Sequence, residues 1–227
     1  MATFILVAGT HHGGWCFDTI AEQLRSQGHQ VFAPTLSGLE LEPTGQTGIN
    51  LDTHIDDVLA VIGDNNLEDV VLVGWSYGGT VITGVSGKTN KIGHLVYLDG
   101  VLPLPGQREW DCLPESAQSN FLASCTDGLN MDVPPGFTAF EPRMRPHPLA
   151  TKLQAVHYDQ ADFDKLPKTF VFAEKWFHDP SDPGFIRPIF ERVRTQPAWT
   201  TYSLPFGHDL PREAPNEVAE ILLKTVA

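Results

Sequence analysis

The stretch VGWSYGG, residues 73–79, sets a single serine, Ser76, among three glycines. Glycine costs backbone entropy and gives up side-chain packing, so this density of glycine around one hydroxyl indicates a tight turn. A side chain at position 74 or 78 would collide with the neighbouring strand or helix. The pattern Gly-x-Ser-x-Gly between an apolar strand and a helix is typical of a turn that presents a nucleophile. Ser76 is therefore the candidate nucleophile, and the free N–H groups of the following helix favour negative charge beside it.

A serine hydroxyl needs a base, and the base needs a third group that orients it. The sequence holds nine histidines. We favour His208, because in PFGHDLPREAPNEVAEIL it follows the last predicted strand and precedes the C-terminal helix. His11 and His12, in the first turn, are interpreted as structural or pocket-lining residues. Four further histidines are interpreted as surface residues or as core residues whose hydrogen bonds are made, and their spacing is not that of metal ligands: His29, His54, His94 and His157.

Strands and helices alternate along the chain, which predicts a mainly parallel sheet of six strands with helices on both faces. Short apolar or β-branched runs predict the strands: Thr3 to Val7, Gln30 to Ala33, Val70 to Val73, His94 to Leu98, Thr169 to Ala173 and Trp199 to Leu204. Apolar residues at helical spacing predict the helices: Trp15 to Ser26, Leu51 to Ile62 with Asn50 as N-cap, Thr80 to Val85, Pro183 to Arg194 and Arg212 to Val226.

The alternation stops in residues 102–166, a stretch rich in proline with scattered aromatic residues such as Trp110, Phe121, Phe137 and Phe140. We interpret this stretch as a cap inserted into a core formed by residues 1–101 and 167–227; an irregular surface excursion is the alternative.

Composition limits the remaining functions. The chain has 227 residues, 41% hydrophobic and 19% charged, and a formal net charge of −13, which suits one soluble domain and argues against nucleic acid or an anionic membrane as partner. No apolar run reaches the roughly 18 residues of a membrane helix, so we expect a cytoplasmic protein. Cys16, Cys112 and Cys125 have no metal-type spacing and are expected to be reduced thiols.

Four segments together resemble the α/β-hydrolases, specifically the compact branch of plant methylesterases, hydroxynitrile lyases and bacterial esterase-like proteins. The segments are VAGTHHGGW, VGWSYGG, LVYLDGVLP and PFGHDLPREAPNEVAEIL, and the resemblance runs almost from end to end. It implies an oxyanion hole made of the backbone N–H groups of Thr10 and Tyr77. The family's usual His-Gly at the first turn is Ala8-Gly9 here. The lyase relatives carry threonine at the position of Gly9, so the resemblance favours hydrolysis.

The resemblance leaves the acid of the triad open. The position expected after the strand Thr169 to Ala173 falls on Trp176, which cannot serve, and Asp179 lies three residues further on. Asp99, at the end of the strand beside the nucleophile strand, is the other candidate. Either carboxylate could reach an imidazole arriving from the last strand, because neighbouring strands lie about 4.8 Å apart. We prefer Asp99, since it ends a clean strand, whereas Asp179 lies in a turn-like HDPSDPG; Glu174 is a third choice.

These residues predict a serine hydrolase that cleaves a small to medium apolar or aromatic ester or lactone through an acyl-enzyme on Ser76. The alternatives are a lyase or C–C bond hydrolase with the same triad, and a catalytically silent ligand-binding protein. No metal or organic cofactor is implied. The expected partner is a small-molecule substrate, with a homodimer left open. Expected substrate-binding residues are His12, Trp15, Trp110 and Trp176.

Overall fold

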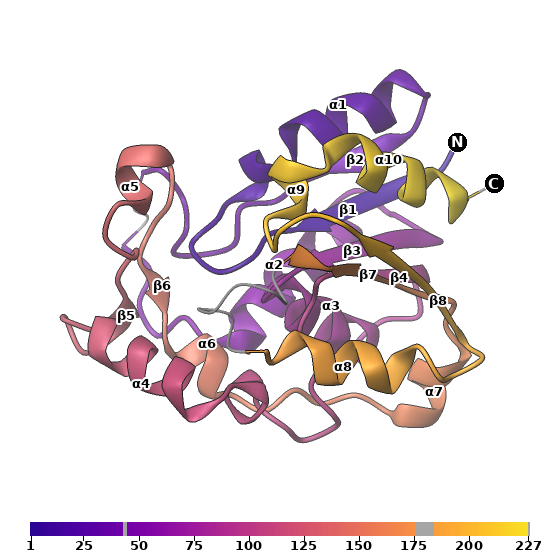
Figure 1. Cartoon of the computed structure of the whole chain (residues 1–227). Coiled ribbons are helices and arrows are strands. Elements are labelled where there is room, and N and C mark those ends of the chain that lie inside the picture. The colour runs from indigo at the N-terminus through magenta and orange to yellow at the C-terminus, as the bar shows by residue number, and fades with distance from the viewer. Residues whose placement is uncertain (43–44, 176–183, 227) are drawn as a thin grey trace.

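A computed structural model describes residues 1–42, 45–175 and 184–226. Its main sheet has six parallel strands in the order β2-β1-β3-β4-β7-β8, which confirms the predicted fold class (Figure 1). The strands are β1 (Thr3–Val7), β2 (Gln30–Phe32), β3 (Val70–Trp75), β4 (Ile92–Leu98), β7 (Lys168–Ala173) and β8 (Trp199–Leu204). A second, antiparallel pair consists of β5 (Asn130–Met131) and β6 (His147–Pro148).

Helices lie on both faces of the main sheet. The longer helices of the chain, among them α4 beyond the edge of the sheet, are α1 (Asp18–Ser26), α2 (Leu51–Asp64), α3 (Gly78–Ser86), α4 (Glu115–Ser124), α8 (Ile186–Val193) and α10 (Pro215–Lys224). The shorter ones are η1 (Gly14–Phe17), η2 (Glu109–Cys112), α5 (Phe137–Phe140), α6 (Ala150–Leu153), α7 (Gln160–Lys165) and α9 (Leu210–Glu213). Asn50 caps α2 as expected, because its side chain accepts a hydrogen bond from the N–H of Thr53.

Two predicted helices are divided in the structure. The expected helix Trp15 to Ser26 begins as the 3-10 turn η1 and continues as α1. The expected C-terminal helix is broken into α9 and α10 at Ala214, whose φ of −137° is not helical. Pro215 explains this break, because proline disfavours the helical conformation of the residue before it.

The core is split by the sheet into two apolar layers. Side chains alternate along a strand, so Phe4 and Leu6 of β1 pack under α1 and α10, whereas Ile5 and Val7 face α2 and α3. Figure 1 shows α1, α9 and α10 on one side of the sheet and α2, α3 and α8 on the other. Because all six strands are parallel, their carboxyl ends meet at one edge of the sheet.

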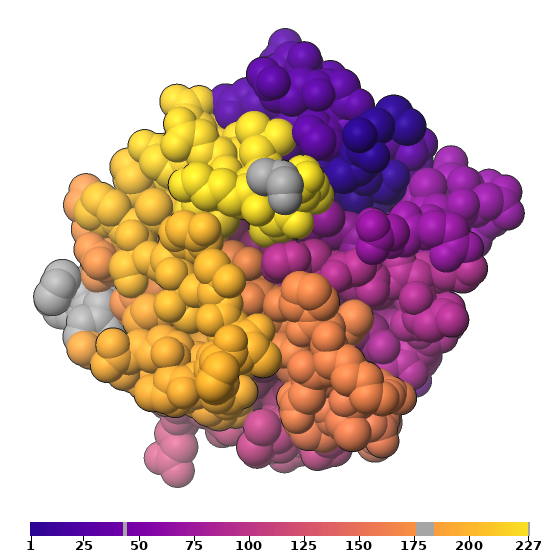
Figure 2. All heavy atoms as spheres, turned by 90° about the vertical axis from the view of Figure 1, so that its right-hand side faces the viewer, coloured from indigo at the N-terminus to yellow at the C-terminus, as the bar shows by residue number. Residues whose placement is uncertain are grey.

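Most of the segment 102–166 lies beyond that carboxyl edge. Figure 1 shows α4, α5, α6, β5 and β6 there, away from the chain termini. Seen from the side of the termini, the pink part of this segment appears at the lower edge, whereas its salmon-coloured end lies on the face toward the viewer (Figure 2). Its last helix, α7, returns to the core through the buried Phe163. Among the described residues, no helix is long and apolar enough to cross a membrane.

Candidate active site

Ser76 lies in the turn between β3 and α3, at the carboxyl edge of the sheet. Its φ of 54° is in the left-handed region, an uncommon conformation for a residue with a side chain. A Cβ on Gly78 would lie 2.3 Å from the carbonyl oxygen of Val7, and one on Gly74 would lie 2.4 Å from the carbonyl oxygen of Gly78. Side chains cannot fit at these two positions, as the sequence predicted, and the turn holds Ser76 in a strained, outward conformation.

Three residues that are far apart in sequence form one hydrogen-bonded chain. His208 Nε2 lies 2.8 Å from Ser76 Oγ, and His208 Nδ1 lies 2.7 Å from Asp99 Oδ2. A buried carboxylate accepts hydrogen bonds, so Nδ1 carries the proton and Nε2 is left to accept from the serine hydroxyl. This is the tautomer that a general base needs.

Asp99 is fully buried at the end of β4 and has a φ of 44°. Its second oxygen, Oδ1, accepts a hydrogen bond from the N–H of Ala173 on the neighbouring strand β7. The carboxylate is thus held between β7 and the imidazole. Glu174 is exposed to solvent. Asp179 and Trp176 lie outside the described residues.

Trp75, which the sequence reasoning did not single out, holds the histidine loop. Its indole N–H donates to the carbonyl oxygen of His208 at 2.7 Å, and the two rings lie 5.7 Å apart. The ring of His12 packs edge-on against Trp75 and beside Trp15. His12 is therefore next to the group that positions His208.

The turn after β1 lies directly against the nucleophile. A Cβ on Gly9 would be 3.0 Å from the Cβ of Ser76. The N–H of His12 closes the turn on the carbonyl oxygen of Gly9, with His11 at a φ of 68°. Within the described residues, no protein acceptor is found for the backbone N–H of Thr10 or of Tyr77. Two free donors beside a serine are what an oxyanion hole requires.

Tyr77 is fixed by its side chain as well as by the turn. Its fully buried hydroxyl lies 2.8 Å from His54 Nδ1, and His54 Nε2 lies 2.9 Å from the carbonyl oxygen of Ser37. Since a carbonyl only accepts, Nε2 donates to Ser37 and Nδ1 accepts from the tyrosine. Burial lowers the pKa of His54 from 6.5 to about 4, so this histidine is neutral and can accept.

His147 forms a buried contact with the first turn. Its Nδ1 accepts from the N–H of His11 at 3.3 Å, and its Nε2 lies 3.0 Å from the hydroxyl of Thr151. Burial holds the pKa of His147 well below its usual value. The segment 102–166 therefore contacts the first turn through a neutral imidazole.

A buried ion pair also contacts this turn. Lys152 of α6 and Glu109 of η2 are 1% and 2% exposed, and their Nζ and Oε1 atoms are 2.5 Å apart. The same ammonium donates to the hydroxyl of Thr10 at 3.0 Å, while Glu109 accepts from the hydroxyl of Thr80 at 2.8 Å. No sequence pattern pointed to this pair, because its residues are 43 positions apart in an irregular stretch.

The expected substrate-binding residues are only partly brought together. His12 and Trp15 line a cavity of about 340 Å³ with Phe140, Arg143 and Asp209, the neighbour of His208. Its lining, as far as the chain is described, includes neither Ser76 nor Trp110. Trp110 lies partly buried in η2, beside Glu109. In the described ranges, no group of three or more His, Cys, Asp or Glu side chains is arranged to hold a metal ion.

A parallel sheet with a strained serine turn, and with an aspartate and a histidine just after two other strands of that sheet, is the arrangement of the α/β class of hydrolases. The model of the family described as "Alpha/beta hydrolase family" matches residues 4–221, and the chain belongs to this family. The predicted resemblance is thereby confirmed.

Relatives of the chain fall in the same class. It is 35% identical to the "Carbendazim hydrolyzing esterase" of a Nocardioides species, over 98% of each chain. It is 31% identical to Methylesterase 18 of Arabidopsis thaliana over 45% of this chain and 40% of that protein. An extracellular alpha/beta-hydrolase from a Paenibacillus species has a similar structure, with a TM-score of 0.81 and 22% identity over 99% of this chain and 98% of that one.

Proposed function

We propose that the chain hydrolyses a small to medium apolar or aromatic ester or lactone through an acyl-enzyme on Ser76. The observation that carries this proposal is the chain of hydrogen bonds from Ser76 through His208 to Asp99, at 2.8 and 2.7 Å. Each member stands in the order that acyl transfer requires, with nucleophile, base and orienting acid in contact.

In the proposed mechanism, His208 Nε2 takes the proton of Ser76 as its oxygen attacks the ester carbonyl. The N–H groups of Thr10 and Tyr77 hold the negative oxygen of the tetrahedral intermediate. His208 then protonates the leaving alcohol as the C–O bond breaks. A water molecule, deprotonated by the same imidazole, attacks the acyl-enzyme and releases the acid. Asp99 stabilises the imidazolium formed in each half-reaction.

The predicted class of enzyme, a serine-dependent ester hydrolase of the α/β-hydrolase family, is confirmed by the family match and by full-length similarity to an esterase. The finer assignments of the triad, the oxyanion hole and the cap 102–166 are proposals supported by the contacts described above. The proposed setting is cytoplasmic, with a small molecule as the partner and neither nucleic acid nor membrane; a homodimer stays open. Because the full-length relative is named for carbendazim, that compound belongs among the substrates tested.

The test is turnover of short-chain p-nitrophenyl esters and carbendazim by the wild type and by Ser76→Ala, Asp99→Asn and Asp179→Asn. We expect Ser76→Ala and Asp99→Asn to lose turnover and Asp179→Asn to keep it. Mass spectrometry of the wild type, quenched during turnover, should show an acyl group on Ser76. If only Asp179→Asn lost turnover, the acid of the triad would be Asp179 and not Asp99. Absence of any ester turnover in the wild type would favour the lyase or ligand-binding alternatives.

A further inference from the structure

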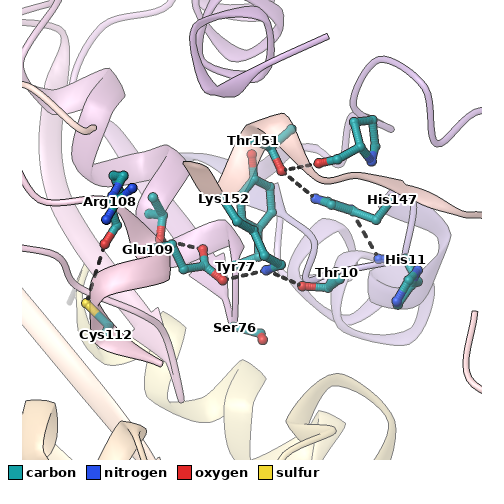
Figure 3. A network of polar contacts seen from close by, with 12 residues as sticks. Thr10, His11, Ser76, Tyr77, Arg108, Glu109, Cys112, His147, Thr151 and Lys152 are labelled. Carbon is teal, nitrogen blue, oxygen red and sulfur yellow. Dashed lines mark hydrogen bonds and ion pairs between the residues drawn. The ribbon is translucent and has the colours of Figure 1, made fainter. Parts of the chain in front are cut away.

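The ammonium of Lys152 is buried beside the proposed oxyanion hole, and its surroundings fix it in place. One N–H donates to Glu109 and another to the hydroxyl of Thr10, as Figure 3 shows. The rings of Tyr77 and Phe121 lie 4.9 and 5.2 Å from the same nitrogen. A cation between a carboxylate and two aromatic faces has little freedom to move. The carboxylate and the two rings thus hold the ammonium where it donates to Thr10.

This bond sets the direction of the Thr10 hydroxyl. An ammonium group has donors and no acceptor, so the threonine oxygen must accept from Lys152 and its own proton must point elsewhere. Among the residues that the structure describes, no hydrogen bond uses that proton. A hydroxyl that accepts from a cation is polarised and becomes a stronger donor. Thr10 thus has a donor prepared by Lys152 for a group that enters the site.

The location of Thr10 indicates what that group is. The residue before it, Gly9, approaches the Cβ of Ser76 so closely that an added Cβ would lie at 3.0 Å. The proposed oxyanion donors are the backbone N–H of Thr10 itself and that of Tyr77, whose ring contacts the same ammonium. Figure 3 shows Ser76, Tyr77, Thr10 and Lys152 gathered in one place. Thr10 therefore belongs to the group of residues around Ser76, where the reacting carbonyl would bind.

We propose that the hydroxyl of Thr10, polarised by the Glu109–Lys152 pair, is a further donor to the reacting carbonyl oxygen. Thr10 is then a catalytic residue through its side chain as well as its backbone, and Lys152 and Glu109 are positioning residues. The inference rests on the proposed function. It also makes the oxyanion hole depend on the segment 102–166, since both charged residues come from η2 and α6 of that segment.

The experiment measures how fast diethyl p-nitrophenyl phosphate modifies Ser76. In this reaction a bond forms between Ser76 Oγ and phosphorus, the bond to p-nitrophenolate breaks, and His208 takes the serine proton. The phosphoryl oxygen gains negative charge as the ester carbonyl would. The rate is read from the burst of p-nitrophenolate, so it does not depend on knowing the natural substrate.

Two changes test the path through the hydroxyl. Thr10→Val removes the hydroxyl and keeps the shape and backbone N–H, while Glu109→Gln with Lys152→Met removes the pair without stranding a charge. We expect each to slow modification by about 10- to 100-fold. In the Thr10→Val background, loss of the pair should add less than about 3-fold, because both act through one hydroxyl. Thr10→Ser should restore most of the rate.

The matched control is Lys168→Met. Lys168 is also a buried lysine, but it binds backbone carbonyls of Phe163 and Leu166 at the amino end of β7. Its loss should leave the rate within about 2-fold, with thermal unfolding measured for every variant. A wild-type rate in Thr10→Val, or losses that multiply in the combined variant, would overturn the inference while leaving the proposed function intact. A wild type that reacts no faster than Ser76→Ala would refute both.

Discussion

Buried neutral histidines around the first turn should make the fold sensitive to acid. Burial lowers the pKa of His11 and of His54 from 6.5 to about 4. Between these values the unfolded chain binds more protons than the folded chain, so the free energy of unfolding falls as the pH falls. The stabilisation is present above pH 6.5 and is lost on the way to pH 4. With 1.36 kcal/mol per pKa unit, each histidine costs about 2 kcal/mol at pH 5 relative to pH 7.

The substitution His54→Gln isolates one of these contributions. Glutamine has both a donor and an acceptor, so it can still pair with the Ser37 carbonyl and the Tyr77 hydroxyl, but it does not titrate. Urea unfolding followed by tryptophan fluorescence at pH 7, 6 and 5 gives the free energies. Over this range the wild type should lose about 2 kcal/mol more stability than His54→Gln.

The exposed His157 provides the matched control. His157→Gln should follow the wild-type pH dependence, because exchange of an exposed imidazole removes no buried neutral group. If His54→Gln and the wild type lost the same stability between pH 7 and pH 5, acid sensitivity would not come from this histidine, and the reasoning would be wrong.

Three further perturbations address the site itself. Asp99→Asn should lower kcat for a p-nitrophenyl ester by roughly 10³- to 10⁴-fold, because an amide cannot hold the productive tautomer; a loss under 10-fold would exclude Asp99 as the acid. Trp75→Phe removes the hydrogen bond to the His208 carbonyl and should lower kcat about 10-fold with little change in KM, whereas an unchanged kcat would show that the loop holds without it. Gly78→Ala places a methyl group against the Val7 carbonyl and should destabilise the fold by about 1–3 kcal/mol in urea unfolding; wild-type stability would show that the turn can relax.

The fold was predictable because its strands are short apolar runs separated by glycine, proline and polar residues. The sequence placed β1 and β8 at the bounds observed, Thr3–Val7 and Trp199–Leu204. It could not foresee the 3-10 turn η1, because that turn depends on a contact between distant residues. A Cβ on Gly14 would lie 1.8 Å from the carbonyl oxygen of Ala33, so the chain passes directly beside the segment after β2. Helical spacing does not contain this information.

The candidate site was predictable only where a local pattern marks it. Ser76 follows from its glycines, and His208 from its place between the last strand and the last helix. The acid stayed open because the choice depends on which carboxylate reaches the imidazole across strands β4, β7 and β8. The structure puts Asp99 2.7 Å from His208, while Asp179 lies outside the described residues. No sequence pattern marked Lys152, because its partners Thr10, Tyr77, Glu109 and Phe121 come from separate stretches of the chain.

The polar groups buried around the first turn and the Ser76 turn lower the stability of the fold, and their partners suggest what they do in the proposed mechanism. A buried ion pair such as Glu109–Lys152 often stabilises a fold less than an apolar pair of the same volume would. Histidines that are buried in the neutral form likewise lower the free energy of unfolding in mild acid. Yet these groups converge on the same few residues: Lys152 on Thr10, His147 on His11 and His54 on Tyr77. Catalysis by an oxyanion hole requires donors that are already oriented when charge develops. Polar bonds, unlike apolar packing, fix the direction of a donor, so under the proposed mechanism these groups cost stability and orient both the first turn and the Ser76 turn.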